Sequence, residues 1–212
     1  METRLLSPEE KKITTPESVE MMQSMVKHAQ TAIQRGTANW LMYWGCVNAF
    51  TALLNFALLY VLKNPLYAYG VWILIIPYIA INVVMDIKLI KPPVIRSHID
   101  SIVTSIWTAY DYALIIFVIV ITGFAWYWNF SLFAILSPVV LLCAGVAQYV
   151  TAQVLQFKAY LRGAVIMWIG SIACMLVAVL LSPEYQLLVL PCSMLLGFTW
   201  TGYSLKKHVK KN

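Results

Sequence analysis

The sequence predicts an all-α membrane protein with six transmembrane helices, arranged as three helical hairpins and preceded by an N-terminal amphipathic helix. Three observations lead to this prediction. Of the 212 residues, 61% are hydrophobic and 11% are charged, whereas a soluble domain carries about 25% charged residues. The apolar residues fall into six runs, each near the about 20 residues that a membrane-spanning helix needs. Positive charges gather in every second connection between these runs.

Residues 1–38 are expected to form a cytoplasmic or interfacial segment, in which residues 14–36 make a discrete amphipathic helix. Thr15 suits the N-cap, Pro16 suits the first helical position, and Gly36 is a stop signal. Apolar residues recur at the three- and four-residue spacing of one helix face. They are Val19, Met22, Val26, Ala29 and Ile33, widened by Met21 and Met25.

This apolar stripe has to be covered. It can lie on the membrane surface, fold back onto the inner loops, or bind a partner protein. Methionine-rich surfaces suit adaptable recognition. The residues that would dock a partner are Met22, Met25, Val26 and Ile33.

The transmembrane domain is expected to cover residues 39–205. Its predicted spans are Trp40–Leu62, Leu66–Ile90, Ile102–Ala125, Phe130–Val154, Gly163–Leu181 and Tyr185–Leu205. The connections after the first, third and fifth spans are short and contain turn formers such as Ser182 and Pro183, which predicts three hairpins. Each even span carries a proline that is expected to kink it. These prolines are Pro77, Pro138 and Pro191.

The distribution of lysine and arginine predicts the orientation. Fourteen of the fifteen such residues lie before the first span, in the second and fourth connections, or in the basic tail, residues 206–212; only Lys63 lies on the other side. Positively charged connections stay in the cytoplasm, so both termini are expected there. This placement accounts for the net charge of +6 without nucleic acid, and we expect no direct nucleic-acid binding.

Polar residues inside the predicted spans are further candidates for function. Trp107 is expected to mark the inner edge of the membrane, because tryptophan favours the interfaces. Asp111 lies four residues further along the chain, about 6 Å inside that edge. Ionisable residues at such positions are functional candidates. The functional interpretation is a cytoplasm-facing polar pocket made of Asn48, Asn82, Asp86, Asp111 and Gln148. The alternative is hydrogen bonding between helices and contact with interfacial water, with no further role.

Motifs of catalysis and metal binding are missing from the sequence. There is no HExxH, no GxSxG and no phosphate-binding loop. The four cysteines lie in apolar runs without a CxxC pair, and His28, His98 and His208 are far apart. We therefore expect no enzymatic activity, no metal and no cofactor.

The segment ESVEMMQSMVKHAQ, followed by WLMYWG and five further spans, resembles an uncharacterised family of bacterial six-span inner-membrane proteins with an N-terminal cytoplasmic helix. The likeness is best over residues 1–50. It implies that the protein lies in the bacterial inner membrane. It also implies a small winged-helix transcription regulator as a cytoplasmic partner of the N-terminal helix. It implies no activity and no catalytic residue.

The sequence leaves three hypotheses for function. The first is a sensory or partner-recruiting membrane protein, whose spans respond to membrane lipids or an amphiphile and whose N-terminal helix binds a cytoplasmic protein. The second is a small-solute transporter or channel in which Asp111 couples to a cation or proton. Because so small a bundle has little room for a path, either role calls for a homo-oligomer. The third is an enzyme acting on lipid head groups, for which the inner loops offer only Asp100 as an acid.

Overall fold

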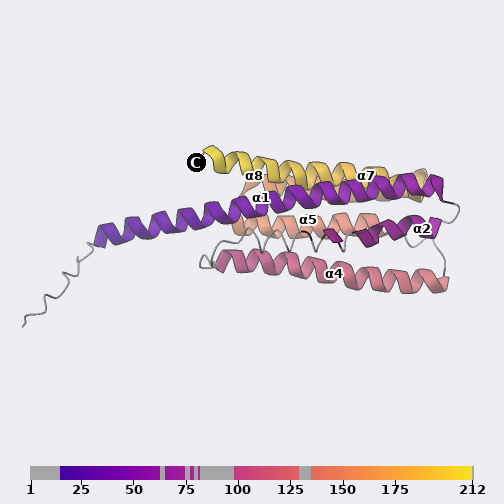
Figure 1. Cartoon of the computed structure of the whole chain (residues 1–212), viewed down its shortest axis with the longest axis horizontal. Coiled ribbons are helices and arrows are strands. Elements are labelled where there is room, and N and C mark those ends of the chain that lie inside the picture. Colours follow the sequence, from indigo (N-terminus) through magenta and orange to yellow (C-terminus); the bar gives the residue numbers. More distant parts are fainter. Residues whose placement is uncertain are drawn as a thin grey trace, which may run out of the picture.

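The structure is a computed structural model that describes the backbone of residues 15–62, 65–74, 77–78, 81, 98–128 and 135–211. Nearly all of these residues are helical and none is in a strand. The long helices lie side by side along one axis (Figure 1). Among the described residues, five helices are long and apolar enough to cross a membrane. They are Gly36–Val61, Ser101–Ile121, Leu136–Leu155, Lys158–Leu180 and Pro183–His208. The predicted all-helical class is therefore confirmed, and these five helices indicate a multi-pass membrane protein.

The first helix, α1 (Thr15–Val61), is a single helix of 47 residues. It continues through Gly36, so the prediction that Gly36 ends a separate helix is wrong. One glycine costs about 1 kcal/mol relative to alanine inside a helix. The alanine, glutamine, arginine, leucine and methionine residues on both sides are good helix formers, and they outweigh that cost. The N-terminal part of α1 extends beyond the bundle (Figure 1).

The chain then turns back along α1. The short helix α2 (Pro65–Tyr69) and the 3-10 helix η1 (Gly70–Leu74) both pack against α1. The side-chain amide of Asn55 is oriented so that both of its polar atoms are paired. Its nitrogen donates to Ala68 O (3.0 Å), and its oxygen accepts from Trp72 Nε1 (2.8 Å).

A second contact lies further along this segment, where Tyr43 donates its hydroxyl proton to Tyr78 O (3.0 Å). Asn55 pairs with residues 68–72, whereas Tyr43, earlier in α1, pairs with Tyr78. The segment therefore runs antiparallel to α1. Most of the predicted second span, Leu66–Ile90, lies outside the described residues.

The remaining elements are long helices that run back and forth along the bundle, together with two short helical turns (Figure 1). They are α4 (His98–Trp128), α5 (Leu136–Leu155), α6 (Lys158–Leu180), the 3-10 turn η3 (Pro183–Tyr185), α7 (Gln186–Met194), the π-helical turn η4 (Leu195–Thr199) and α8 (Trp200–Lys211). Helix α8 runs on through residues 206–211, so the basic tail is part of it. The contacts between α5 and α6, and between α1 and the last span, join helices from different predicted hairpins.

Two of the predicted proline kinks have different outcomes. Pro191 lies inside α7 and is buried, and the π-helical turn η4 follows it, as expected where a proline disturbs the hydrogen-bond ladder. Pro138 lies in the first turn of α5. Backbone N–H groups in a first turn have no partner within the helix, so a proline there removes no hydrogen bond. It cannot kink the helix there, so that prediction is wrong. The carbonyl oxygen of Pro138 instead accepts a hydrogen bond from Ser171 Oγ at 2.7 Å.

Helix α4 has the most exposed apolar surface of the five spans, because only 11% of its span is buried. Ile115, Ile116 and Ile119 are 55%, 62% and 65% exposed. A contiguous apolar face of this kind is rare on a soluble monomer. It is the surface expected to contact lipid chains.

Glycines allow the first and last spans to approach each other closely. A Cβ atom on Gly202 would lie 2.6 Å from Ala38 O, and a Cβ atom on Gly45 would overlap the side chain of Thr199. Ala38 is fully buried in this contact. Small residues of this kind are typical where membrane helices pack backbone against backbone.

We predict that Gly202→Ala lowers the stability of the bundle. The added methyl group would meet the backbone of α1, and overpacking of this kind costs about 1–3 kcal/mol. The measurement is thermal unfolding of the purified protein in detergent. The matched control is Gly123→Ala in α4, where a Cβ atom would have nothing within 4 Å. Equal unfolding temperatures for the two variants would contradict the close approach of α1 and α8.

Candidate functional site

Only two residues, Gln156 and Phe157, connect α5 to α6. Gln156 has φ 51° and ψ 38°, the left-handed conformation, and its N–H donates to Ala152 O. The N–H of Phe157 also donates to Ala152 O, at 3.3 Å. This resembles the usual C-terminal helix stop, with glutamine where glycine is common. Residues 158–162, predicted as a charged connection, are instead the first turns of α6, because the chain reverses within two residues.

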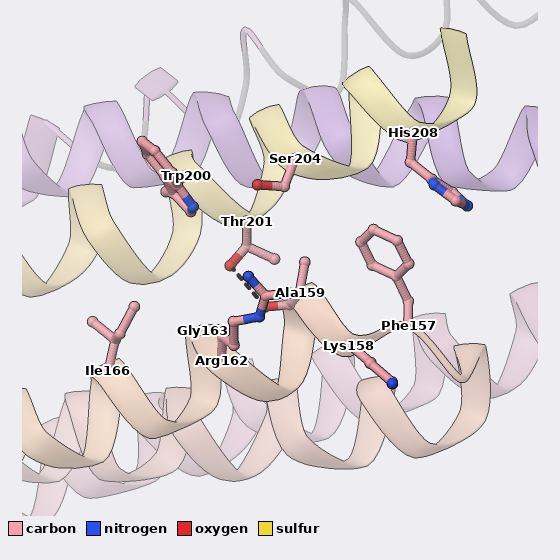
Figure 2. A pocket seen from close by; sticks show the side chains of 10 residues that line it. All are labelled: Phe157, Lys158, Ala159, Arg162, Gly163, Ile166, Trp200, Thr201, Ser204 and His208. Atoms are coloured by element: carbon pink, nitrogen blue, oxygen red, sulfur yellow. Dashed lines mark hydrogen bonds between the residues drawn. The ribbon is translucent and has the colours of Figure 1, made fainter. Parts of the chain in front are cut away.

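A pocket of about 290 Å³ lies between the start of α6 and one face of α8 (Figure 2). We call it the basic pocket. From the α6 side it is lined by Phe157, Lys158, Ala159, Arg162, Gly163 and Ile166. From the α8 side it is lined by Trp200, Thr201, Ser204 and His208. Its volume is near the lower limit for small-molecule sites.

Helical spacing explains why these side chains meet. Lys158 and Arg162 are four residues apart, so they share one face of α6. Thr201, Ser204 and His208 are three and four residues apart and share one face of α8. Figure 2 shows the two sets facing each other across the pocket.

Two contacts join the walls of the basic pocket. Thr201 Oγ1 donates to Ala159 O at 3.4 Å, and the rings of Phe157 and His208 lie 5.3 Å apart. The two helices are therefore in contact at both ends of the pocket's polar part.

The floor of the pocket is Gly163. A Cβ atom there would lie 2.5 Å from both Gln148 Oε1 and Thr201 Oγ1, and 2.7 Å from Gly197 O. Three oxygen atoms thus converge on the Cα hydrogen of Gly163, an arrangement that allows weak C–H···O contacts. Gln148 is fully buried, and its Nε2 donates to Gly197 O at 3.0 Å. Its Oε1 has no hydrogen-bond donor within the described part of the chain.

The pocket is electropositive. Lys158 and Arg162 are exposed, and none of the described residues that line the pocket is acidic. Helix α6 begins at Lys158 and no side chain caps it. The positive end of its dipole therefore adds to the two cationic side chains. This arrangement suits an anion such as a phosphate or carboxylate.

Three members of the predicted polar pocket, Asn48, Asp111 and Gln148, lie among the described residues. Asn48 Nδ2 donates to Trp44 O in its own helix at 2.8 Å. Asp111 is exposed on α4, and Gln148 is buried between α5, α6 and the last span. Neither the basic pocket nor a second, open apolar groove along α1 is lined by any of the three. Asn82 and Asp86 lie outside the described residues, and the polar pocket stays a prediction.

The predicted docking residues all lie in the N-terminal part of α1, where only the backbone is described. They are Met22, Met25, Val26 and Ile33. Because α1 is helical throughout, their spacing keeps these positions on one face.

Sequence reasoning assigned Lys158 and Arg162 to membrane orientation alone and did not select them as site residues. Their four-residue spacing, and the same spacing of Ser204 and His208, is the signal that could have marked two polar faces. That these faces oppose each other depends on the packing of α6 against α8.

We predict that Gln148→Leu destabilises the bundle by about 1 kcal/mol, because Gly197 O loses its side-chain donor in a buried contact. Thermal unfolding in detergent measures the effect. Gln153→Leu is the control, since Gln153 is exposed on the same helix and should change stability by less than about 0.5 kcal/mol. If the two variants unfold alike, the Gln148 amide does not link α5 to the last span.

No family model, no curated protein and no solved structure matches this chain. The family resemblance and the partner that it implies therefore stay predictions, and the candidate site depends on the geometry of the basic pocket alone.

Proposed function

We propose that the chain is a sensory or partner-recruiting membrane protein of the bacterial inner membrane. The observation that carries this proposal is the continuity of α1. One helix of 47 residues joins the predicted docking positions to the first span, Gly36–Val61. A partner bound at the N-terminal part of α1 would therefore be attached directly to the transmembrane bundle.

The length and packing of α1 support this role. Residues 15–35 would extend about 30 Å at 1.5 Å per residue. The same helix is then held against the last span, where Ala38 and Leu41 are fully buried. With no break at Gly36, a force or a restriction applied to the N-terminal part reaches the bundle through a continuous hydrogen-bonded helix.

We infer six crossings, with both termini in the cytoplasm. Helix α1 ends and α2 begins at one end of the bundle, whereas α4 begins at the other end (Figure 1). The bond from Tyr43 to Tyr78 O supports a second, antiparallel crossing that starts with the segment after α1. Helix α6 begins beside the C-terminal part of α8, where Phe157 lies against His208, and α8 ends at the end of the bundle where α4 begins (Figure 1). The positive residues at the start of α6 favour the cytoplasmic side for this end.

The alternative function, a small-solute transporter or channel, has one observation in its favour. The carboxylate of Asp111 is exposed on the span Ser101–Ile121, where a charge is costly unless water or another subunit covers it. A homo-oligomer with α4 at the interface would provide that cover. A solute flux in vesicles that Asp111→Asn abolishes would favour this alternative over recruitment.

The test of recruitment is site-specific photo-crosslinking in cells. A crosslinking amino acid at Met22 or Val26 should capture a small winged-helix regulator, the partner implied by the resemblance. The same amino acid at Thr31, on the opposite face of an ideal helix, should capture little. The captured regulator, purified, should bind the wild-type chain and fail to bind Met22→Asp. Adducts only to lipid or to the chain itself would contradict recruitment.

A further inference from the structure

We propose that the basic pocket binds an anionic glycerophospholipid. The lipid phosphate would lie on Arg162 and Lys158, and an acyl chain would run past Ile166 and Trp200. This inference names a ligand class for the proposed sensor. It rests on the proposed function in one respect, because that function puts the pocket at the cytoplasmic interface of the membrane.

The polar end of the pocket has the chemistry that a phosphate diester needs. The guanidinium of Arg162 can donate two parallel hydrogen bonds to phosphate oxygens. Lys158 adds a second cation and Ser204 adds a hydroxyl donor on the facing helix. The start of α6 contributes backbone N–H groups and the positive end of its dipole.

Polarity changes along the pocket in the order that a lipid requires. Lys158 to Ile166 and His208 to Trp200 each cover eight residues, about 12 Å along their helices. The first end is cationic and polar, and the second is apolar. A soluble anion would gain nothing from the apolar end. An interfacial lipid would use both ends, because basic pockets between membrane helices on the cytoplasmic side bind anionic head groups.

The apolar end also continues onto the outer surface of the bundle. The same helix faces carry Ile169 on α6 and Leu196 on η4, which are 61% and 53% exposed. Trp200, 61% exposed, has the amphipathic ring that is enriched at membrane interfaces. An acyl chain leaving the pocket therefore meets apolar side chains.

A bound lipid would contact α6 and α8 together. Because a ligand that binds only the folded state raises its stability, occupancy should stabilise the bundle. The same packing links the pocket to α1, since Gly202 of α8 lies against Ala38.

The experiment uses the full chain, purified and stripped of lipid in detergent. Phosphatidylglycerol, phosphatidylcholine and inorganic phosphate are added separately, and native mass spectrometry and thermal unfolding are measured. We expect phosphatidylglycerol to be retained and to raise the unfolding temperature, and the other two additives to have little effect. Arg162→Gln should lower retention of phosphatidylglycerol by about fivefold, which corresponds to the roughly 1 kcal/mol that one basic residue contributes near an anionic lipid.

The control variant removes the same charge elsewhere. Lys206→Gln lies on α8 outside the pocket lining and should retain phosphatidylglycerol as the wild type does. Arg162→Lys should keep most of the retention. Arg162→Gln without lipid should match the wild type in size-exclusion elution and circular dichroism; if it does not, Lys158→Gln takes its place.

Three results would overturn the proposal. They are equal loss of retention in Lys206→Gln and Arg162→Gln, equal retention of the two phospholipids, and stabilisation by inorganic phosphate as large as that by phosphatidylglycerol. Binding in detergent does not depend on orientation or on a protein partner. Failure here is therefore distinct from failure of the crosslinking test of recruitment.

Discussion

The bundle depends on close backbone contact at glycines. Lipid chains are as apolar as leucine, so burial alone gives membrane helices little reason to associate, and packing and polar contacts have to hold them. Two such contacts meet on the last span. Gly202 lies against Ala38 O of α1, and Gly163 of α6 lies against Gly197 O. The last span is therefore the element to which both the first helix and the pocket-forming helix are held.

This arrangement joins the two proposed roles through one helix. Neighbouring residues of the last span face different partners: Gly202 faces α1, and Thr201 faces α6 and the basic pocket. A lipid held between α6 and α8 and a protein bound to α1 would thus act on the same element. A ligand shifts a conformational equilibrium only as far as it binds one state better than another. The π-helical turn η4 is where such states could differ, because π-helical turns often occur at functional sites.

The fold class could be predicted from sequence because it depends on local composition. The predicted span Tyr185–Leu205 lies inside the observed helical stretch Pro183–His208, and the turn at Ser182 and Pro183 is where it was expected. The errors at Gly36 and Pro138 share one cause. Both predictions ignore where in the helix the helix-breaking residue lies. Neither a single glycine among good helix formers nor a proline in a first turn interrupts a helix.

The basic pocket could not be predicted, because its two walls are more than thirty residues apart in the chain and meet only through helix packing. Lys158 and Arg162 also belong to the charge pattern that predicts membrane orientation. That pattern explains the two residues without a binding site. The polar residues chosen instead, Asn48 and Asp111, were selected by depth along a helix, and depth says nothing about which way a side chain faces.

The most direct test of the account uses a native cysteine. Cys46 Sγ lies 3.8 Å from Thr199 Oγ1, so Thr199→Cys would put a second thiol beside it. With Cys143, Cys174 and Cys192 replaced by alanine, mild oxidation of the membranes should join residues 46 and 199 within one chain, and Leu196→Cys should give no such bond. Failure to cross-link residues 46 and 199 while both thiols still react with maleimide would contradict the packing of α1 on the last span.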